Sequence, residues 1–452
     1  MAAPAHSRNS YAACLTSRDF VLFYIGQYVS FIGDRLAQLA FVAVLMGTIQ
    51  AGQAVTGASS RVTLLMAVSL LPYLYMFPLS GWIIDRFRRR NVMIVCTVLQ
   101  GVFAIAGAEL IRAQGFHTVS PWVIYGTVLA IYTCSAVFNP AKYAFIPQIV
   151  EPEHLLAANA LNTSTATIST LIGTFLGVML IDALWRATGS ETTGIVWSLW
   201  LDTVTFFVPG LLLALITGDL KRPPQPAPRA ESPWRRAGEG VRHLLRHRVA
   251  LRLLGLTGIT WFIGGFFNAA LNQVMIDFLG SSLRQYGMTF GTIGLGMFSG
   301  AILTGLICRR LSPRAVMGSG LLGTGVLLIA TRLTLSVPGL RVASLFAIAA
   351  TAGCAIVTMD TTFQRITPNR VRGRVFALNF LVATGALVTG MVAFLGAQRL
   401  GVSSWLLGAM PRLTTTSSVN FQLLGLVAMA GGLLAWQGET PMRRGWRQRR
   451  MI

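Results

Sequence analysis

Apolar stretches of about 20 residues recur along the whole chain, separated by shorter polar segments, and a stretch of this length crosses a bilayer as an α-helix. Twelve such spans are predicted, at residues 20–48, 62–84, 91–112, 120–138, 156–183, 194–217, 250–279, 287–308, 314–336, 341–362, 374–398 and 418–437. We therefore expect an all-α membrane protein with twelve transmembrane helices.

Composition agrees with a membrane protein, because 54% of the 452 residues are hydrophobic and only 12% are charged. A soluble domain has about twice that share of charge. Residues 1–18 are polar and lead directly into the first long span, so we expect no cleavable signal peptide. The five cysteines stand singly and predict neither a disulfide nor a metal site.

A net charge of +22 could indicate a nucleic-acid partner, and the positions of the 37 Lys and Arg residues decide whether it does. Most of them lie in alternate connections, namely the amino-terminal segment, 86–90, 139–155, 218–252, 309–314, 363–374 and the carboxyl tail. Positive loops stay in the cytoplasm, whereas nucleic-acid binding gives no reason to sort arginines by loop parity. We expect a multi-pass protein of the cell inner membrane, with both termini cytoplasmic and no nucleic-acid partner.

The chain is divided into two similar halves by a Pro-rich and then basic cytoplasmic segment. The predicted units are a six-helix bundle at 1–217, a linker at 218–249 and a second bundle with a basic tail at 250–452. The linker arginines are expected to bind anionic lipid head groups, with a regulatory or partner site as the alternative. Residues 81–90 align with 305–314, and 139–147 with 360–368, which indicates a duplicated unit and two pseudo-symmetric six-helix bundles.

The loop between the second and third spans has the pattern G-x-x-x-D-R-x-x-R-R, formed by Gly81, Asp85, Arg86, Arg89 and Arg90. In pattern and position it resembles the signature loop of the major facilitator superfamily. Segments 26–40, 139–161, 201–207 and 364–377 resemble the drug-efflux and lysophospholipid-transporter branches of that superfamily. The fifth span departs from many such exporters, because residues 173–177 contain glycines but no Gly-Pro pair.

The resemblance implies that the signature loop is a conformational latch on the cytoplasmic side. Asp85 would lie against the positive amino-terminal end of span 11, for about 0.3–1 kcal/mol; a merely structural turn is the alternative. The second half has Arg309 at the equivalent position. We therefore expect Arg309 or Arg310 to pair with Glu151 and Glu153, which precede span 5.

Span 1 has a polar stripe formed by Gln27, Ser30, Asp34 and Gln38, which share one helical face. A carboxylate deep in a membrane is costly, so Asp34 is a candidate proton carrier or cation ligand. A structural pairing in the neighbourhood of Arg35 is the competing interpretation for Asp34.

Arg35 and Asp202 lie at similar predicted depths in spans 1 and 6, and they are expected to form a buried structural ion pair.

Further polar residues are candidates for lining a central cavity, namely Tyr132 in span 4, Asn162 in span 5, and Asn268 and Asn272 in span 7. Interhelical packing is the alternative role for each of them.

The resulting functional prediction is a monomeric secondary transporter that works by alternating access, without a cofactor or metal. The resemblance implies export of small amphipathic molecules. Proton coupling through Asp34 is the expected energy source, because the sequence has no nucleotide-binding loop or accessory domain to use ATP. A lysophospholipid flippase is the first alternative, suggested by residues 139–147 and by a possible role of Arg35 in neutralising a lipid phosphate. A transport-dead membrane receptor or scaffold is the second. An enzyme is not expected, because no catalytic His/Asp constellation faces either surface.

Overall fold

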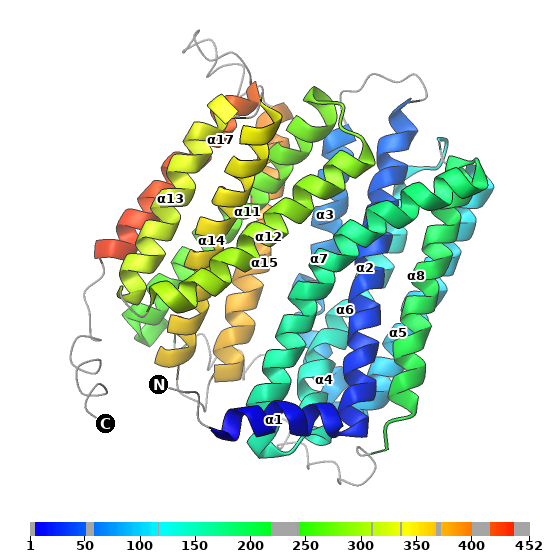
Figure 1. Cartoon of the computed structure of the whole chain (residues 1–452), viewed down its shortest axis with the longest axis horizontal. Helices are drawn as coiled ribbons and strands as arrows, with labels where there is room; N and C mark the ends of the chain where they lie inside the picture. The colour runs from blue at the N-terminus through cyan, green and yellow to red at the C-terminus, as the bar shows by residue number, and fades with distance from the viewer. Residues whose placement is uncertain are drawn as a thin grey trace.

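The computed structural model describes residues 5–50, 58–115, 117–217, 242, 244–308, 311–334, 337–367, 372–399 and 416–437. Almost all of these residues are helical, and the long helices run roughly alongside one another in two groups (Figure 1).

The amino-terminal bundle begins with α1 (Ala5–Thr16), which lies across one end of the bundle (Figure 1). Its long helices are α2 (Arg18–Gln50), α3 (Ala58–Tyr75) with α4 (Phe77–Arg86), α5 (Arg89–Gln114), α6 (Pro121–Ile149), α7 (Leu155–Thr188) and α8 (Glu191–Ala214). A short 3₁₀ turn, η1 (Pro152–His154), precedes α7. We call the end of the molecule that holds α1 the α1 end.

The carboxy-terminal bundle begins with α11 (Arg248–Gln273), which continues as the π-helical turn η2 (Val274–Phe278). It goes on with α12 (Leu283–Ile307), α13 (Pro313–Thr334), α14 (Pro338–Ile366), α15 (Arg372–Arg399) and α17 (Thr416–Gln437). We call the end of the molecule where η2 lies and α3 begins the η2 end.

Each predicted span coincides with a helix, or with the pair α3 and α4. Within the described residues, nine helices are long and apolar enough to cross a membrane, and α3 with α4 forms a tenth candidate bent by 53°. The bend lies at Met76, two residues before Pro78. Pro78 lacks the backbone N–H that would bond the carbonyl of Leu74 one turn earlier, and its ring crowds that carbonyl, which explains the break. The predicted fold class is confirmed.

The fourth and tenth spans are longer than predicted. The segment 139–147, predicted to be the exit loop of the fourth span, lies inside α6, which continues to Ile149 with Pro140 and Pro147 in its interior. Likewise α14 continues to Ile366. Proline does not end a helix whose freed backbone groups are satisfied by packed neighbours in a membrane protein. This correction moves Lys142 from a predicted loop into a helix.

The two bundles use equivalent helix pairs. Packing of α2 on α7, α3 on α6, α5 on α8 and α5 on α6 is repeated by α11 on α15, α12 on α14, α13 on α17 and α13 on α14. Between the bundles, α3 packs on α15 and α7 packs on α12, which are again equivalent by the repeat. The internal repeat seen in the sequence therefore describes both the bundles and their interface.

Glycines allow close backbone approach at equivalent helix pairs in the two bundles. A Cβ added at Gly390 of α15 would strike the carbonyl oxygen of Phe262 in α11. In the other bundle, a Cβ added at Gly173 of α7 would lie 3.2 Å from the Cα of Ile32 in α2. Small residues at such crossings let membrane helices pack tightly without a hydrophobic driving force.

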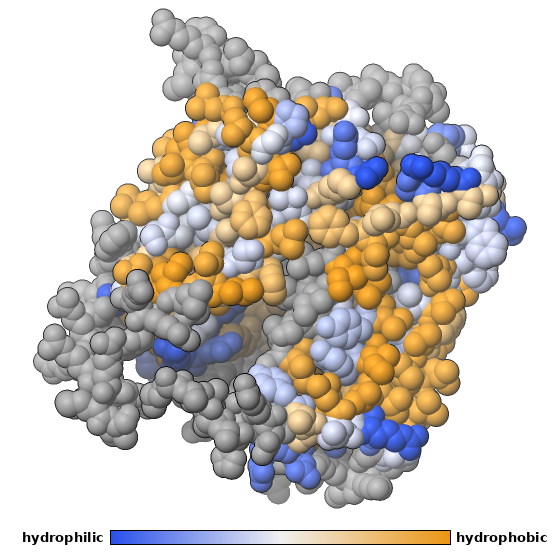
Figure 2. Space-filling view, viewed as in Figure 1, coloured by the Kyte–Doolittle hydropathy of each residue, from blue (hydrophilic) through white to orange (hydrophobic). Residues whose placement is uncertain are grey.

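Hydrophobic side chains cover much of the visible face between the two ends, and strongly hydrophilic ones gather near the ends (Figure 2). Large apolar side chains such as Trp122, Met179, Leu211 and Leu333 are more than half exposed. Such an exposed apolar surface suits lipid rather than water.

Candidate functional site

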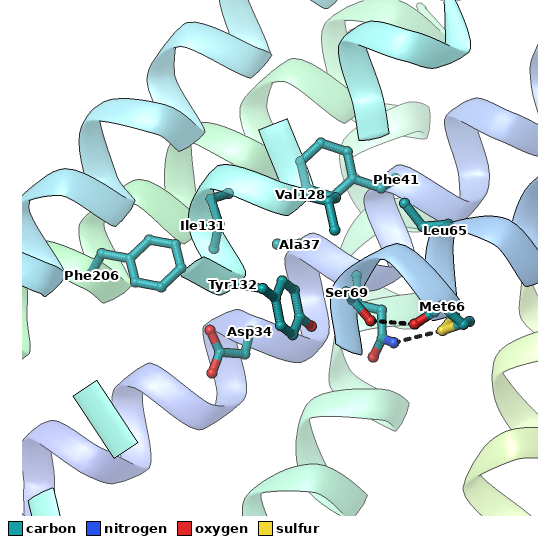
Figure 3. A pocket seen from close by; sticks show the side chains of 11 residues that line it. Asp34, Ala37, Phe41, Leu65, Met66, Ser69, Val128, Ile131, Tyr132 and Phe206 are labelled. Atoms are coloured by element: carbon teal, nitrogen blue, oxygen red, sulfur yellow. Dashed lines mark hydrogen bonds between the residues drawn. The ribbon is translucent and has the colours of Figure 1, made fainter. Parts of the chain in front are cut away.

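Asp34 lies in the middle of α2 and lines a small cavity within the amino-terminal bundle. The cavity has a volume of about 20 Å³, which is room for roughly one water molecule. Its polar lining is formed by Asp34, Gln38, Ser69 and Tyr132, and Figure 3 shows the Asp34 carboxylate beside the Tyr132 ring. The Gln38 amide donates a hydrogen bond to Met66 Sδ at 3.0 Å. Asp34, Gln38 and Tyr132 thus share one site, as the polar stripe suggested for the first two.

Lys142 is a charged residue of this region that was not predicted as part of the site. It lies inside α6 with 2% of its surface exposed, and its ammonium stands 4.7 Å from the ring centre of Phe31 and 5.2 Å from that of Tyr143. Within the described residues the ammonium forms no hydrogen bond or ion pair, and its charge interacts with that of Asp34. Aromatic faces attract a cation by about 1–2 kcal/mol when water is excluded. Extending the fourth helix past Pro140 would have revealed Lys142 from the sequence.

The predicted ion pair between Arg35 and Asp202 is not formed in this structure. Arg35 Nη1 donates a hydrogen bond to Gln38 Oε1 at 2.7 Å. Asp202 is fully buried and accepts a hydrogen bond from Thr205 Oγ1 at 2.9 Å. Gly33 is the residue of α2 that faces Asp202 and Thr205. Arg35 lies two residues further on, about 200° around the helix, so it points away from Asp202.

Asp202 leaves one polar atom unsatisfied. Its Oδ2 has no hydrogen-bond partner within the part of the chain that the structure describes. A buried carboxylate oxygen without a partner is costly, and it marks a site where a proton or a water completes the bonding.

A second, larger cavity of about 440 Å³ lies in the carboxy-terminal bundle. Its polar lining consists of Thr260, Trp261, Asn268, Thr324 and Arg35, and the other lining residues are apolar side chains or glycine. Arg35 belongs to α2, so one bundle contributes a guanidinium to a cavity formed mainly by the other. The prediction for Asn268 as a lining residue agrees with this placement.

The other predicted cavity residues have different surroundings. Gln27 and Asn162 are each 2% exposed and are not among the residues that line either cavity. Ser30 is partly buried, and it too lies outside both linings. Asn272 is fully buried; it donates a hydrogen bond from Nδ2 to Thr63 Oγ1 at 3.2 Å, across the two bundles. For Asn272 the interhelical packing role, and not the cavity role, describes the structure.

Polar contacts join the two bundles at the η2 end. Asp277 in η2 accepts hydrogen bonds from Ser59 of α3, from the hydroxyl at 2.5 Å and from the backbone N–H at 3.3 Å. Tyr286 supports the Asn272 contact by donating its hydroxyl to Asn272 Oδ1 at 2.9 Å. Ser60 Oγ lies 3.4 Å from Gln398 Oε1 of α15. We call these contacts the η2-end network; only Asn272 had been singled out as a site residue from the sequence.

The signature loop lies at the α1 end, between α4 and α5. Arg86 is exposed, with its guanidinium 5.6 Å from the centre of the Trp82 ring. Arg89 donates to the carbonyl oxygen of Ala144 at 2.8 Å, and Arg90 donates to the carbonyl oxygen of Ile216. These two arginines therefore tie the loop to the ends of α6 and α8.

The remaining latch residues are less constrained by the structure. Gly81 is exposed, and a Cβ added there would meet nothing within 4 Å. Glu151 and Glu153 are exposed. The Asp85 side chain and residues 309–310 lie outside the described part of the chain, so both predicted latch contacts stay predictions.

Comparison with known proteins agrees with this architecture. A family model for the Major Facilitator Superfamily matches residues 23–391. Macrolide efflux protein A of Streptococcus pyogenes is 24% identical over 86% of this chain and 91% of its own length. Lysophospholipid transporter LplT of Serratia proteamaculans (strain 568) is 29% identical over 37% of this chain and 38% of its own length. The crystal structure of a D-xylose-proton symporter has the same fold, with a TM-score of 0.68 and 16% identity over 93% of this chain and 98% of that one. The chain therefore belongs to the Major Facilitator Superfamily and is a membrane transporter.

Proposed function

We propose that this protein is a proton-coupled exporter of small amphipathic molecules that works by alternating access. The observation that carries the proposal is the η2-end network, a set of polar contacts between the two bundles, together with a cavity of about 440 Å³ lined by residues of both bundles. A transporter whose two repeats rock against each other needs a ligand site near their interface and polar contacts that can break at one end. Relatedness to macrolide efflux protein A supports export as the direction.

Asp34 is the proposed proton carrier. It lies in a cavity that admits about one water molecule, and the Lys142 ammonium nearby has no other counter-ion within the described residues. A proton on Asp34 removes its attraction for Lys142, and loss of the proton restores it. Such a change in a buried charge pair supplies the differential interaction that shifts a two-state equilibrium.

The orientation that fits this mechanism has the α1 end in the cytoplasm. The arginines of the signature loop lie at this end, and positive residues are retained on the cytoplasmic side. In the proposal the η2-end network closes the outer side, and Asp85 with its arginines closes the cytoplasmic side in the alternate state. The protein acts as a monomer in the inner membrane.

Flux through reconstituted vesicles tests the function. Uptake of a radiolabelled macrolide and of a fluorescent lysophospholipid is measured with and without an acid-inside pH gradient. We expect uptake of at least one of the two compounds that needs the gradient, stops with a protonophore and loses its pH dependence in Asp34→Asn. Asp182→Asn is the matched control, because Asp182 is partly exposed and pairs with Arg186 of its own helix at 2.9 Å. Unchanged pH dependence in Asp34→Asn would remove Asp34 from coupling.

Lysophospholipid flipping is the second candidate function. The observation that favours it is the guanidinium of Arg35 in an otherwise uncharged cavity, together with similarity to LplT over part of the chain. Uptake of the lysophospholipid but not of the macrolide in the same vesicles would select this function.

A further inference from the structure

The cavity in the carboxy-terminal bundle has an unusual charge distribution. Arg35 is the only charged residue in its lining, and it enters from the other bundle. Most of the wall is apolar, with Phe267, Ile293 and Leu328 among its residues. The cavity volume of about 440 Å³ is within the range of pockets that hold small ligands, about 300–1,000 Å³.

The Arg35 guanidinium is held in place but has donors to spare. Within the described residues its one hydrogen bond is from Nη1 to Gln38, and it forms no ion pair. The stem of the side chain packs against Gly173 of α7, where an added Cβ would lie 3.0 Å from Arg35 Cβ. A guanidinium has five N–H donors in a planar fork that matches a carboxylate or a phosphate. Most of this fork is therefore available to a ligand.

The acidic side chains of the neighbouring helices lie outside this cavity, although the Asp34 carboxylate attracts the Arg35 guanidinium. Asp34 faces the separate small cavity beside Tyr132. Asp202 is held by Thr205 on the other side of α2. Asp277 is engaged by Ser59 at the η2 end. None of the three carboxylates lines the larger cavity. In a medium of low dielectric constant, a cation whose carboxylate partner lies outside the cavity still attracts an anion and repels a second cation.

We propose that the substrates are amphipathic anions, with a carboxylate or phosphate head on Arg35 and an apolar body in the carboxy-terminal cavity. This proposal rests on the proposed function and names its substrate class. Binding would also join the two bundles, because the head group is held by α2 and the body by α11, α12 and α14. Asn268 and Thr260 are polar residues of the same lining. A cationic amphiphile of equal length would bring a second positive charge beside Arg35.

Binding of matched twelve-carbon amphiphiles tests the substrate class. The full-length protein in lipid nanodiscs is incubated with radiolabelled dodecanoate, and bound label is counted by scintillation proximity. Dodecyl phosphate is expected to compete, whereas dodecyltrimethylammonium, with the same tail, is expected to compete at least about ten-fold more weakly because of charge repulsion. Equal competition by the anionic and cationic compounds would overturn the proposal.

Variants separate the head-group contact from the tail contact. Arg35→Gln is expected to weaken dodecanoate binding by about ten-fold or more, and Arg35→Lys to restore part of it. Ala352→Phe fills the cavity wall without touching the charge, and it is expected to abolish binding even if Arg35→Gln fails to fold. Arg112→Gln is the control, because Arg112 is exposed and pairs with Glu109 of its own helix. Unchanged affinity in the folded Arg35→Gln or Ala352→Phe variant would refute the site.

The experiments distinguish failure of the transport function from failure of the anionic substrate class. If the protein binds dodecanoate at Arg35 but moves no compound in the vesicle assay, the transport function is wrong and the site stands. If the vesicles carry out pH-driven macrolide uptake while dodecanoate does not bind, the function stands and the anionic substrate class is wrong.

Discussion

Asp277 offers the most direct test of the η2-end network as a gate. Its carboxylate accepts two hydrogen bonds from Ser59 across the bundle interface, at 2.5 and 3.3 Å. A hydrogen bond to a charged acceptor contributes about 1.5–3 kcal/mol. Because the second hydrogen bond is long and Asp277 is only partly buried, we assign this free-energy range to the two hydrogen bonds together. Asp277→Ala should therefore shift the equilibrium about 10- to 150-fold toward the state open at this end.

A cysteine at Ala67 reports this opening. Ala67 is 3% exposed and packs against Val388 and Met391 of α15, so a reagent reaches it from outside only when the bundles separate. In a variant whose native cysteines are replaced, Ala67→Cys is labelled in intact cells with a membrane-impermeant maleimide. We expect the labelling rate to rise by about the same factor in Asp277→Ala, and by less in Asp277→Asn, whose amide oxygen still accepts one hydrogen bond.

The control for this experiment is a carboxylate at the same end whose ion pair, among the described residues, is with its own helix. Asp182 pairs with Arg186 in its own helix, so Asp182→Ala should leave the labelling rate unchanged. Equal labelling in Asp277→Ala and the parent protein, or an equal increase in Asp182→Ala, would refute a gating role for the Ser59 contact.

Three further substitutions test other parts of the structure. Lys142→Met should stop pH-dependent flux, because it removes the charge that responds to the proton on Asp34; intact pH-dependent flux in the folded variant would argue against a coupling role. Gly390→Val should lower the stability by more than about 3 kcal/mol and abolish a monodisperse size-exclusion peak, because a side chain there would strike α11. Gly396→Val should keep that peak, because the space around Gly396 is open. Similar profiles for the two variants would contradict the close crossing of α11 and α15. The double variant Glu151→Gln/Glu153→Gln tests the predicted pairing of these glutamates with Arg309 or Arg310, and it should change both flux and cysteine labelling from the cytoplasmic side. Unchanged flux and labelling would contradict that pairing.

The apolar pattern of the sequence determined the number, order and approximate position of the membrane helices. The physical reason is that a chain crossing lipid must satisfy its backbone hydrogen bonds internally, so each apolar stretch of sufficient length is a helix wherever it packs. The internal repeat likewise predicted two equivalent bundles, because the same segment buries the same face in each copy. The end of the fourth helix was the exception: Pro140 suggested an exit that neighbouring helices made unnecessary.

Which side chains meet was decided by the tertiary structure. Asp34, Arg35 and Gln38 were all visible as polar residues of one span, but the sequence did not give the rotation of α2 against its neighbours. That rotation turns Gly33 toward Asp202 and sends Arg35 into the cavity of the other bundle. Helix periodicity relates residues within one helix, whereas partners on different helices depend on packing that no single segment specifies. The outcome here is an arginine without its predicted partner, in an apolar cavity where an anion would complete it.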